Sequence, residues 1–367
     1  MSYNKVIYLG IIKDEQKNIV GGFAVANERN IYEYKRRGFH VEIIKYPFLK
    51  NKDLVNIIKY VFNWGIFICQ SIFICFQNKN LANNTLIHFT PFYKYFLIVE
   101  YPVVKLIKLF NKNILIDIRA GSFITYYENY GFFYRKLLSA FLKQAKYITV
   151  EGEKYLQFIK EKVNTKAALH YYPNYVKDEQ ILLKQRIFGG EPLKLIYFGR
   201  ITPEKGIDTL IEIHYLLKIK YKVETTIIGS GERNYLNFLK NNIDKSDIVI
   251  LPPQDIGFIN QKLAVSHFFV FPTTHKSEGH SNSLTESMAR GVVPIATDNG
   301  FNKDVILNAG VVMPPNTSAQ QYYEEIDSLI VSEMWEEYSE RSRKRIASNF
   351  SNSIVSSSFF QFINNSK

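Results

Sequence analysis

The sequence predicts an α/β fold built from two Rossmann-like domains, each containing a parallel sheet. Three observations support this prediction. Short apolar runs alternate with helix-length segments, a strand-loop-helix-strand unit opens the chain, and the same alternation restarts after a charged stretch near the middle. The chain has 367 residues, 46% of them hydrophobic, which is enough apolar material for two buried cores.

The first predicted domain begins with a strand over residues 5–12 and a polar loop that ends in Gly21-Gly22. A helical pattern then runs through Arg37, and a second strand covers residues 41–46. This order of elements is typical of a parallel Rossmann-like sheet. Further strands are expected at 85–89, 114–118 and 147–150, with helices at 93–110 and 132–145.

The second half repeats the pattern. Strands are predicted at 193–198, 224–228, 248–251, 268–271 and 293–296, with helices at 206–220, 232–242, 257–265 and 283–290. The seam between the domains is expected between the turn residues Tyr172-Pro173-Asn174 and Gly189-Gly190-Glu191-Pro192. We therefore predict an N-terminal domain of residues 1–180, a C-terminal domain of residues 181–345 and a terminal helix or tail of residues 346–367.

The charge is concentrated in the first half of the chain. Residues 1–180 hold 26 Lys and Arg against 14 Asp and Glu, whereas residues 181–367 hold 20 of each, so the net charge of +12 belongs to the first half. A basic half favours an anionic partner, either phospholipid headgroups or a phosphorylated carrier, over a merely solvated basic surface. Nucleic acid is not expected, because basic runs such as Lys35-Arg36-Arg37 join no recognisable binding motif.

Residues 60–78 contain no charged side chain and are rich in Phe and Ile. This segment is interpreted first as a helix at the core and an interface, with a surface-inserting helix and a membrane-spanning helix as alternatives. Cys69 and Cys75 are poorly spaced for a disulfide, and the N-terminus shows neither a basic leader nor a cleavage site. A cytoplasmic protein is expected, with peripheral docking on the inner membrane face as a further alternative.

A first chemical motif runs from Phe198 to Gly206. It closes a strand, turns and opens a helix, which delivers Arg200 and Lys205 to the carboxyl edge of the sheet, where open α/β sheets bind ligands. Arg offers a bidentate fork for phosphate oxygens and Lys a point charge, so the pair suits a diphosphate without a metal ion. The alternative is two surface cations at the start of a helix. The sequence contains no Asp-x-Asp pair that would hold a metal.

A second motif runs from Glu278 to Gly291 and follows an apolar strand that ends at Phe271. Its small residues Gly279 to Ser283 let backbone amides approach a ligand at the start of the next helix, and Glu286 lies in the first turns of that helix. Carboxylates accept hydrogen bonds from neighbouring sugar hydroxyls. The alternatives are an ordinary loop residue for Glu278 and a capping acid for Glu286.

With seven residues between Glu278 and Glu286, followed by Ser-Met-Ala-Arg-Gly, the second motif resembles the donor signature of family 4 retaining glycosyltransferases. Arg200 and Lys205 stand where that family has its pyrophosphate segment, Gly229 stands in its mid-domain glycine turn, and Gly21-Gly22 resembles its N-terminal glycine loop. The resemblance implies the GT-B fold, in which two Rossmann-like domains face a central cleft.

The resemblance also implies roles for individual residues. Arg200 and Lys205 would clamp the pyrophosphate, Glu278 would contact the transferred sugar, and Glu286 would hold the ribose hydroxyls. Backbone amides of the loop would touch sugar and phosphate, and Gly22 and Gly229 would also approach the donor. The loop residues concerned are Gly279, His280, Ser281, Asn282 and Ser283. His280 is in addition the best histidine candidate for a hydrogen bond to a sugar hydroxyl.

The implied activity is retaining, metal-independent transfer of a hexose from a UDP- or GDP-sugar to a saccharide or lipid-linked saccharide acceptor. The context would be surface polysaccharide biosynthesis, as in similar bacterial enzymes, with no cofactor. In such enzymes the acceptor attacks the face that the leaving group departs from, and the phosphate helps to take the proton. Two rivals remain: a nucleotide-sugar epimerase on the same scaffold, and a non-catalytic protein that binds nucleotide sugars or saccharides.

One departure from the family pattern lies in the first domain. Arg119, at the end of the strand over 114–118, stands where family members often carry a His. Either Asp117 and Arg119 form an ion pair that shapes the sugar pocket, or Arg119 recognises donor or acceptor directly, and Gly21 is expected near the same pocket. His88 alternates with apolar neighbours and is interpreted as a core histidine. In the GT-B fold a terminal helix crosses back onto the first domain, and Phe359, Phe360 and Phe362 would dock it there.

Overall fold

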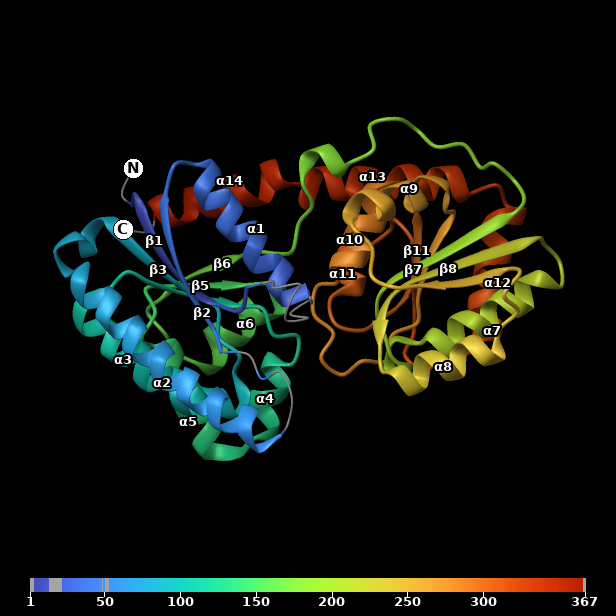
Figure 1. Ribbon diagram of the computed structural model, residues 1–367. Coiled ribbons are helices and arrows are strands. Elements are labelled where there is room, and N and C mark those ends of the chain that lie inside the picture. The colour runs from blue at the N-terminus through green and yellow to red at the C-terminus, as the bar shows by residue number, and fades with distance from the viewer. Residues whose placement is uncertain (1–2, 13–21, 48, 50–52, 366–367) are drawn as a thin grey trace. The chain divides into compact units, whose positions relative to one another are not determined.

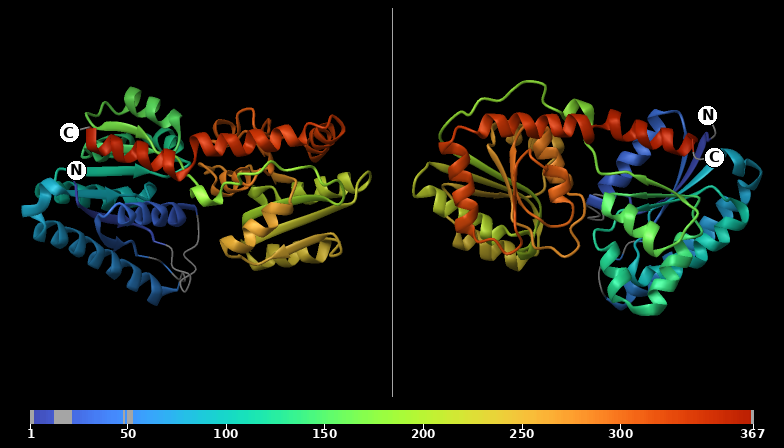
Figure 2. Two further views of the ribbon diagram at one scale, coloured as in Figure 1. Left: turned by 90° about the horizontal axis from the view of Figure 1, so that it is seen from above. Right: turned by 180° about the vertical axis from the view of Figure 1, so that it is seen from behind.

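The computed structural model describes residues 3–12, 22–47, 49 and 53–365, which form two compact α/β units (Figure 1). Unit 1 consists of Met1–Pro173 and Ser356–Lys367, and unit 2 consists of Asn174–Val355. Each unit is built on one six-stranded sheet in which all the paired strands are parallel, and helices flank the sheet of each unit (Figure 2). The predicted fold class, two Rossmann-like domains with parallel sheets, is confirmed.

The sheet of unit 1 has the strand order β2-β1-β3-β4-β5-β6. Every side chain of β3, β4 and β5 is buried, as expected for parallel strands covered on both faces. The strands are β1 (Lys5–Gly10), β2 (His40–Lys45), β3 (Thr85–Phe89), β4 (Ile114–Ile118), β5 (Tyr147–Val150) and β6 (Ala168–Tyr171). The helices between them are α1 (Gly22–Arg36), α2 (Leu54–Gln77), α3 (Leu97–Phe110), α4 (Phe123–Asn129), α5 (Gly131–Leu142) and α6 (Glu153–Lys162).

The sheet of unit 2 has the order β12-β11-β10-β7-β8-β9. Its strands β10 and β11 are buried throughout, and β7 is long enough to carry Arg200 past the core. The strands are β7 (Leu193–Ile201), β8 (Val223–Gly231), β9 (Ile248–Leu251), β10 (Phe268–Phe271), β11 (Val293–Thr297) and β12 (Val311–Met313). The helices are α7 (Ile207–Lys218), α8 (Arg233–Asn242), α9 (Ile256–Val265), α10 (Asn282–Ala289), α11 (Asn302–Ile306), α12 (Ala319–Val331) and α13 (Trp335–Asn349).

The division between the units falls after Pro173, earlier than the predicted boundary after residue 180. Val176 accounts for the difference, because it is buried in unit 2 and joined there to the end of α13. Its amide donates to the carbonyl of Phe350 over 2.9 Å, and its carbonyl accepts from Asn352 over 2.8 Å. The tail is predicted to begin at residue 346. The chain returns to unit 1 only at Ser356, within α14 (Asn352–Asn365).

The last residues of α14 pack on unit 1 through aromatic rings. The Phe359 ring stacks on Tyr172 with centroids 4.4 Å apart, and the Phe362 ring stacks on His170 at 4.6 Å. Phe360 lies edge-on to Tyr34 at 5.5 Å. These three phenylalanines therefore hold the C-terminal helix against the first unit, as the sequence predicted for them.

Helix α2 exposes most of its surface. Among its side chains only Trp64, Phe67, Ser71 and Cys75 are buried, and just 17% of its most apolar stretch is buried. By length and composition alone it is the one helix in the described residues that is apolar enough to cross a membrane. The expectation of a core helix therefore fits one narrow face of α2 and not the rest.

The loop after β3 is fixed by a buried carboxylate on α3. Glu100 is fully buried and accepts hydrogen bonds from the amides of Phe92 (2.6 Å) and Tyr93 (3.2 Å) and from the hydroxyl of Tyr46 (2.9 Å). Burial raises the pKa of Glu100 more than these three hydrogen bonds lower it, and the pKa is about 7. Tyr93 takes a left-handed conformation, with φ of 61°, which its bond to Glu100 helps to hold.

Candidate functional site

The first predicted motif lies at the carboxyl edge of the sheet in unit 2. β7 carries Arg200 beyond the buried core, so its side chain is exposed, and a short 3₁₀ turn over Pro203–Lys205 follows. Gly206 ends that turn in the left-handed conformation, with φ of 74°, before α7 begins. A side chain at Gly206 would place its Cβ 2.2 Å from the Pro272 carbonyl oxygen, so this position requires glycine.

The two predicted motifs are joined directly. The amide of Thr274 donates to the carbonyl of Glu204 over 2.8 Å, which ties the loop after β10 to the turn after β7. The Thr273 hydroxyl oxygen also lies 3.3 Å from the Glu204 carbonyl oxygen. Because β7 and β10 are neighbours in the sheet, segments about seventy residues apart in sequence meet at one edge.

A buried ion pair forms where the motifs meet. The Lys205 ammonium donates to Oε2 of Glu278 over 2.5 Å, and each residue is only 8% exposed. The Thr273 hydroxyl donates to the same Glu278 oxygen over 3.0 Å. Lys205 Nζ also lies 5.3 Å from the centre of the Phe271 ring. The cation predicted to neutralise phosphate and the carboxylate predicted to contact the sugar are therefore held together in one place.

The small-residue stretch runs into the N-terminus of α10. Ser281 caps that helix, its hydroxyl accepting from the Leu284 amide over 3.4 Å, and Asn282 and Ser283 begin it half-buried. Gly279 is also half-buried, as is Glu286 one turn along α10. The N-terminal end of α10 carries the positive pole of the helix dipole, which favours an anionic ligand.

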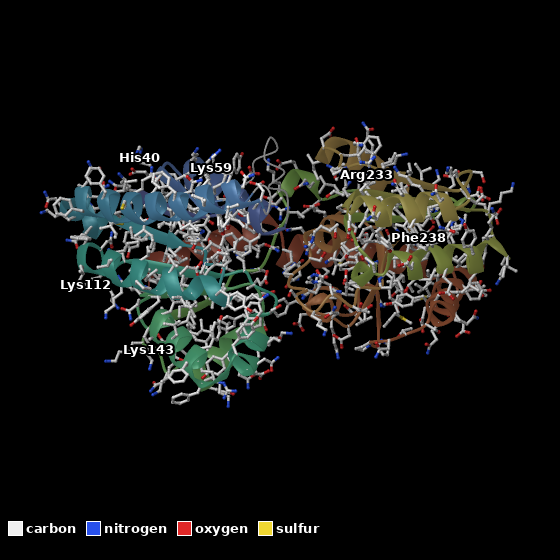
Figure 3. All side chains as sticks on the ribbon, turned by 60° about the horizontal axis from the view of Figure 1, so that its bottom comes forward. His40, Lys59, Lys112, Lys143, Arg233 and Phe238 are labelled. Atoms are coloured by element: carbon white, nitrogen blue, oxygen red, sulfur yellow. The ribbon has the colours of Figure 1, made fainter. Side chains whose placement is uncertain are left out.

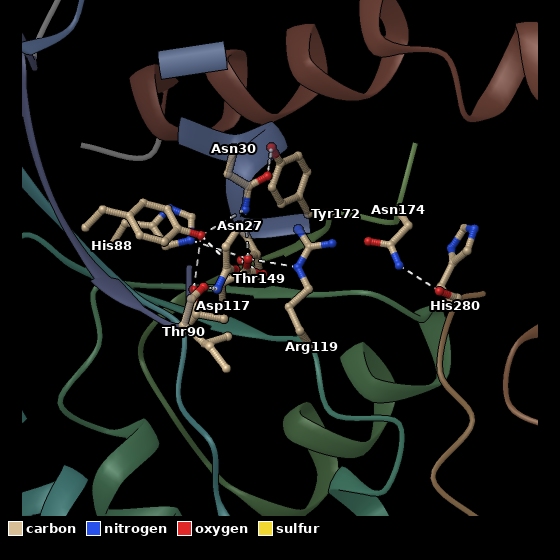
Figure 4. A network of polar contacts seen from close by, with 12 residues as sticks. Asn27, Asn30, His88, Thr90, Asp117, Arg119, Thr149, Tyr172, Asn174 and His280 are labelled. Atoms are coloured by element: carbon tan, nitrogen blue, oxygen red, sulfur yellow. Dashed lines mark hydrogen bonds and ion pairs between the residues drawn. The ribbon is translucent and has the colours of Figure 1, made fainter. Parts of the chain in front are cut away.

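The side chain of His280 is buried within the loop before α10. It is 4% exposed, its Nε2 is hydrogen-bonded to the Thr285 hydroxyl at 2.8 Å, and its ring packs edge-on against Phe350. Its carbonyl accepts from the Asn174 side-chain amide over 2.6 Å, a contact drawn in Figure 4. The arrangement assigns the side chain of His280 a part in shaping the loop, while the prediction that it contacts a sugar hydroxyl is untested.

Gly229 lies beside the first motif, on β8. It pairs with Gly199 in the sheet, and a Cβ at Gly229 would lie 1.7 Å from the Gly199 carbonyl oxygen. The absence of a side chain at Gly229 therefore lets the ends of β7 and β8 approach closely next to Arg200.

The predicted residues of unit 1 belong to a buried polar network centred on Asp117 (Figure 4). Arg119 Nε donates to Oδ2 of Asp117 over 2.8 Å, so of the two alternatives for this pair the structure contains the ion pair. Thr149 donates to the other oxygen over 2.8 Å, and His88 Nε2 and Asn30 Nδ2 each lie 3.3 Å from Oδ2. The charge of Asp117 is thus hydrogen-bonded on both of its oxygens.

His88 and Arg119 are each held on a second side as well. His88 Nδ1 lies 2.9 Å from the Tyr34 hydroxyl, and the Arg119 guanidinium lies 4.7 Å from the centre of the Tyr172 ring. Burial lowers the pKa of His88, which keeps the ring neutral near pH 7. Burial alone would raise the pKa of Asp117, but the Arg119 charge and the bond to His88 lower it to about 2.

Two further predictions concern glycine and metal. Gly22 is the first residue of α1 and is exposed, whereas Gly21 lies outside the described residues. Among the residues that the structure describes, no group of three or more His, Cys, Asp and Glu side chains is placed to hold a metal ion. The expectation of a metal-independent site remains a prediction.

A comparison with protein families gives one match, to the family described as glycosyl transferases group 1. It covers residues 178–349, which include Arg200, Lys205, Glu278 and Glu286. Residues 178–349 are therefore similar to glycosyl transferases group 1. The match falls within unit 2, and the matched segment contains the ion pair and the α10 N-terminus described above. No curated protein matches the chain by sequence.

Solved structures extend the likeness to the whole chain. The chain is similar to sucrose-phosphate synthase from Thermosynechococcus elongatus, with a TM-score of 0.74 and 14% identity over 98% of each chain. It is similar to HepE of Anabaena in complex with UDP (TM-score 0.71, 12% identity, 98% of this chain and 99% of that chain). A glycosyltransferase from Rickettsia africae aligns over 99% of each chain, with a TM-score of 0.69 and 16% identity. At such identities the likeness shows the fold, which is GT-B.

Three residues that support the candidate site are missed in the sequence analysis. Thr273 bonds Glu278, Asn174 bonds the His280 carbonyl, and Asn299 donates from its side chain to the carbonyls of Thr273 and His275 over 3.2 and 3.1 Å. Tyr172-Pro173-Asn174 was singled out only as a seam. The position of Thr273 directly after a buried strand at the ligand-binding edge was the available signal.

Proposed function

We propose that the protein is a retaining glycosyltransferase that moves a hexose from a UDP- or GDP-sugar to a saccharide or lipid-linked saccharide acceptor. The observation that carries this proposal is the Lys205–Glu278 pair between an exposed Arg200 and the α10 N-terminus. Solved neighbours support the choice of donor, because HepE of Anabaena was crystallised with UDP and with UDP-glucose. The reaction would belong to surface polysaccharide biosynthesis in the cytoplasm, where free thiols such as Cys69 persist.

Each group would act on a separate part of the donor. Arg200, exposed at the end of β7, would take pyrophosphate oxygens through its fork, and Lys205 would add a fixed positive charge as the leaving diphosphate gains negative charge. Thr273 keeps Glu278 close to Lys205 and leaves its second oxygen for a sugar hydroxyl. Glu286 would accept from the ribose hydroxyls.

The pairing of Lys205 with Glu278 also orients the Lys205 cation before the donor binds. A buried ammonium needs a hydrogen-bonded anionic partner, and Glu278 provides one for Lys205. The diphosphate would then meet a cation already oriented for it, and little reorganisation would be needed when charge develops in the transition state. Retention of configuration follows in this proposal from attack on the face that the diphosphate leaves, with a phosphate oxygen taking the acceptor proton.

The proposal is tested with a panel of UDP- and GDP-sugars, each incubated with and without a saccharide acceptor. We expect release of nucleoside diphosphate that depends on the acceptor, an α-linked product from an α-linked donor, and activity that survives EDTA. Isomerised donor without acceptor would instead identify an epimerase, and tight binding without turnover a non-catalytic protein. Loss of activity in EDTA that Mg²⁺ or Mn²⁺ restores would contradict the metal-independent mechanism.

A further inference from the structure

Unit 1 carries an apolar surface that the transfer reaction does not use. α3 lies between α2 and α5 and contacts both, and Figure 3 views the molecule from the side on which these helices lie. We call this surface the α2–α3–α5 face. Large apolar side chains project from it into solvent: Phe62 is 69% exposed, Phe73 58%, Leu109 74% and Phe133 85%. Single exposed apolar side chains are ordinary, but a set shared by adjacent helices indicates a binding surface.

The opposite side of α2 is firmly packed. Trp64, Phe67, Ser71 and Cys75 recur at helical spacing and form its buried stripe. The Trp64 ring stacks on Phe96 with centroids 5.5 Å apart, and the Phe67 ring lies 4.8 Å from Tyr46. A membrane-spanning α2 would have to give up these contacts. The outer side of α2 can instead meet a partner while the inner side stays in the fold.

The charge of the same helices indicates which partner fits. Residues 53–112 and 131–143, which include α2, α3 and α5, hold nine Lys and Arg but only two acids, Asp53 and the buried Glu100. Lys59, Lys112 and Lys143 are labelled in Figure 3. Among the described residues, none of these nine cations lies within ion-pair distance of a carboxylate. Their charge is therefore available to an external anion.

We propose that the α2–α3–α5 face docks the protein on an anionic lipid bilayer, with apolar side chains of α2 entering the interface and lysines contacting headgroup phosphates. Apolar insertion and electrostatic attraction act together in interfacial helices, and this face supplies both. A second copy of the chain is a poorer occupant, because two such faces would bring like charges together. The inference concerns where the protein binds and does not rest on the proposed transfer reaction.

The test is vesicle flotation of the full chain. We expect binding to vesicles of phosphatidylcholine and phosphatidylglycerol in equal parts, little binding to phosphatidylcholine alone, and release in 1 M salt, where the screening length falls to about 3 Å. The double variant Phe62→Glu/Phe73→Glu should bind at least tenfold more weakly. Lys59→Glu should reduce the partition coefficient by at least roughly fivefold, since one basic side chain near an anionic surface contributes about that factor.

Matched controls come from α8 of unit 2, where Phe238 is 56% exposed and Arg233 is also exposed. Phe238→Glu and Arg233→Glu, labelled positions in Figure 3, should leave vesicle binding unchanged. Circular dichroism checks that every variant keeps its fold. The charged substitutions lie on exposed positions, so no unfolding is expected.

Four outcomes would overturn the proposal. Equal binding to neutral and anionic vesicles would remove the electrostatic part, and unchanged binding of the Phe62/Phe73 variant would remove the apolar part. A dimer in light scattering that the same variant dissociates, without vesicle binding, would assign the face to a second copy. Resistance of the bound protein to alkaline carbonate would assign α2 to a membrane span. Transfer to a water-soluble acceptor reports separately on the proposed function, because it needs no vesicle.

Discussion

The two units place charged side chains at the edges of their sheets in different ways. In unit 1, Asp117 and Arg119 are sealed in a network whose partners come from β3, β5 and α1, and the Arg119 side chain is 2% exposed. In unit 2, Lys205 and Glu278 pair at an edge that also carries the exposed Arg200. The difference teaches that the first pair is enclosed by hydrogen-bond partners from three elements, whereas the second lies at the edge where we propose that the donor binds.

The largest effect is expected from breaking the pair in unit 1. Asp117→Asn removes a buried charge and leaves Arg119 without its carboxylate, which should lower the free energy of unfolding of unit 1 by about 3–5 kcal/mol. Urea denaturation followed by circular dichroism measures this loss. Asp53→Asn, at an exposed helix cap, is the control and should lose about 1 kcal/mol or less. A loss no larger than that control would show that the network does not stabilise the unit.

The stability difference between wild type and Asp117→Asn should also depend on pH. The pKa of Asp117 is lowered to about 2 in the folded protein and is near 3.9 in an unfolded chain. Its contribution is therefore present above pH ~4 and is lost as the pH falls toward about 2. The stability gap between wild type and Asp117→Asn should narrow by about 2.6 kcal/mol over that window and stay constant between pH 5 and 8.

Breaking the pair in unit 2 should change activity instead. Lys205→Ala removes the fixed cation and is expected to lower kcat by about 10²–10³-fold, or about 2.7–4 kcal/mol in the barrier. Initial rates with the best donor of the panel measure this effect, with Lys240→Ala on the exposed side of α8 as the matched lysine control. A rate within a factor of about two of wild type would remove Lys205 from the catalytic machinery.

A smaller effect is expected from Glu100 of unit 1, on the pH dependence of the free energy of unfolding. The pKa of Glu100 is raised from 4.5 to about 7, so folded wild type holds a proton at pH 5.5 that the unfolded chain has mostly released. The contribution of Glu100 is thus fully present at low pH and is lost as the pH rises through about 7. Relative to Glu100→Gln, wild type should lose about 2 kcal/mol of stability between pH 5.5 and 8.

Urea midpoints of the two proteins at each pH provide this measurement. Comparing wild type with Glu100→Gln cancels the histidines whose pKa values burial lowers, such as His170 and His267. A difference that is constant across the range, or that grows in favour of wild type at high pH, would contradict the assigned shift of Glu100.

Much of the fold could be predicted because buried parallel strands are short apolar runs. The strands at Thr85–Phe89, Ile114–Ile118 and Ile248–Leu251 have the predicted bounds. β6 (Ala168–Tyr171) was missed, since it is half-buried at the edge of the sheet and carries His170. The apolar composition of α2 indicated burial that the fold does not provide, because composition does not specify which side of a helix meets the core.

The candidate site was predicted less completely than the fold. Arg200, Lys205 and Glu278 came from spacing and family resemblance, and the structure brings the last two into contact. The sequence gives no sign that Thr273 shares an oxygen of Glu278 with Lys205, because that contact depends on the register between β7 and β10. Asp117 and Arg119 were recognised as a pair, but their partners on α1 and β5 are set only by packing.

Lys205 and Gly206 are adjacent in the chain, but substitutions at the two positions would have different consequences. Any side chain at Gly206 meets the Pro272 carbonyl, so a replacement there would be eliminated with the folded protein itself. A replacement at Lys205 leaves the backbone unchanged, but it removes the partner of the buried Glu278 and, in the proposed reaction, the cation that meets the diphosphate. Two neighbouring positions are therefore constrained for different reasons: Gly206 by the fold and Lys205 by the proposed reaction.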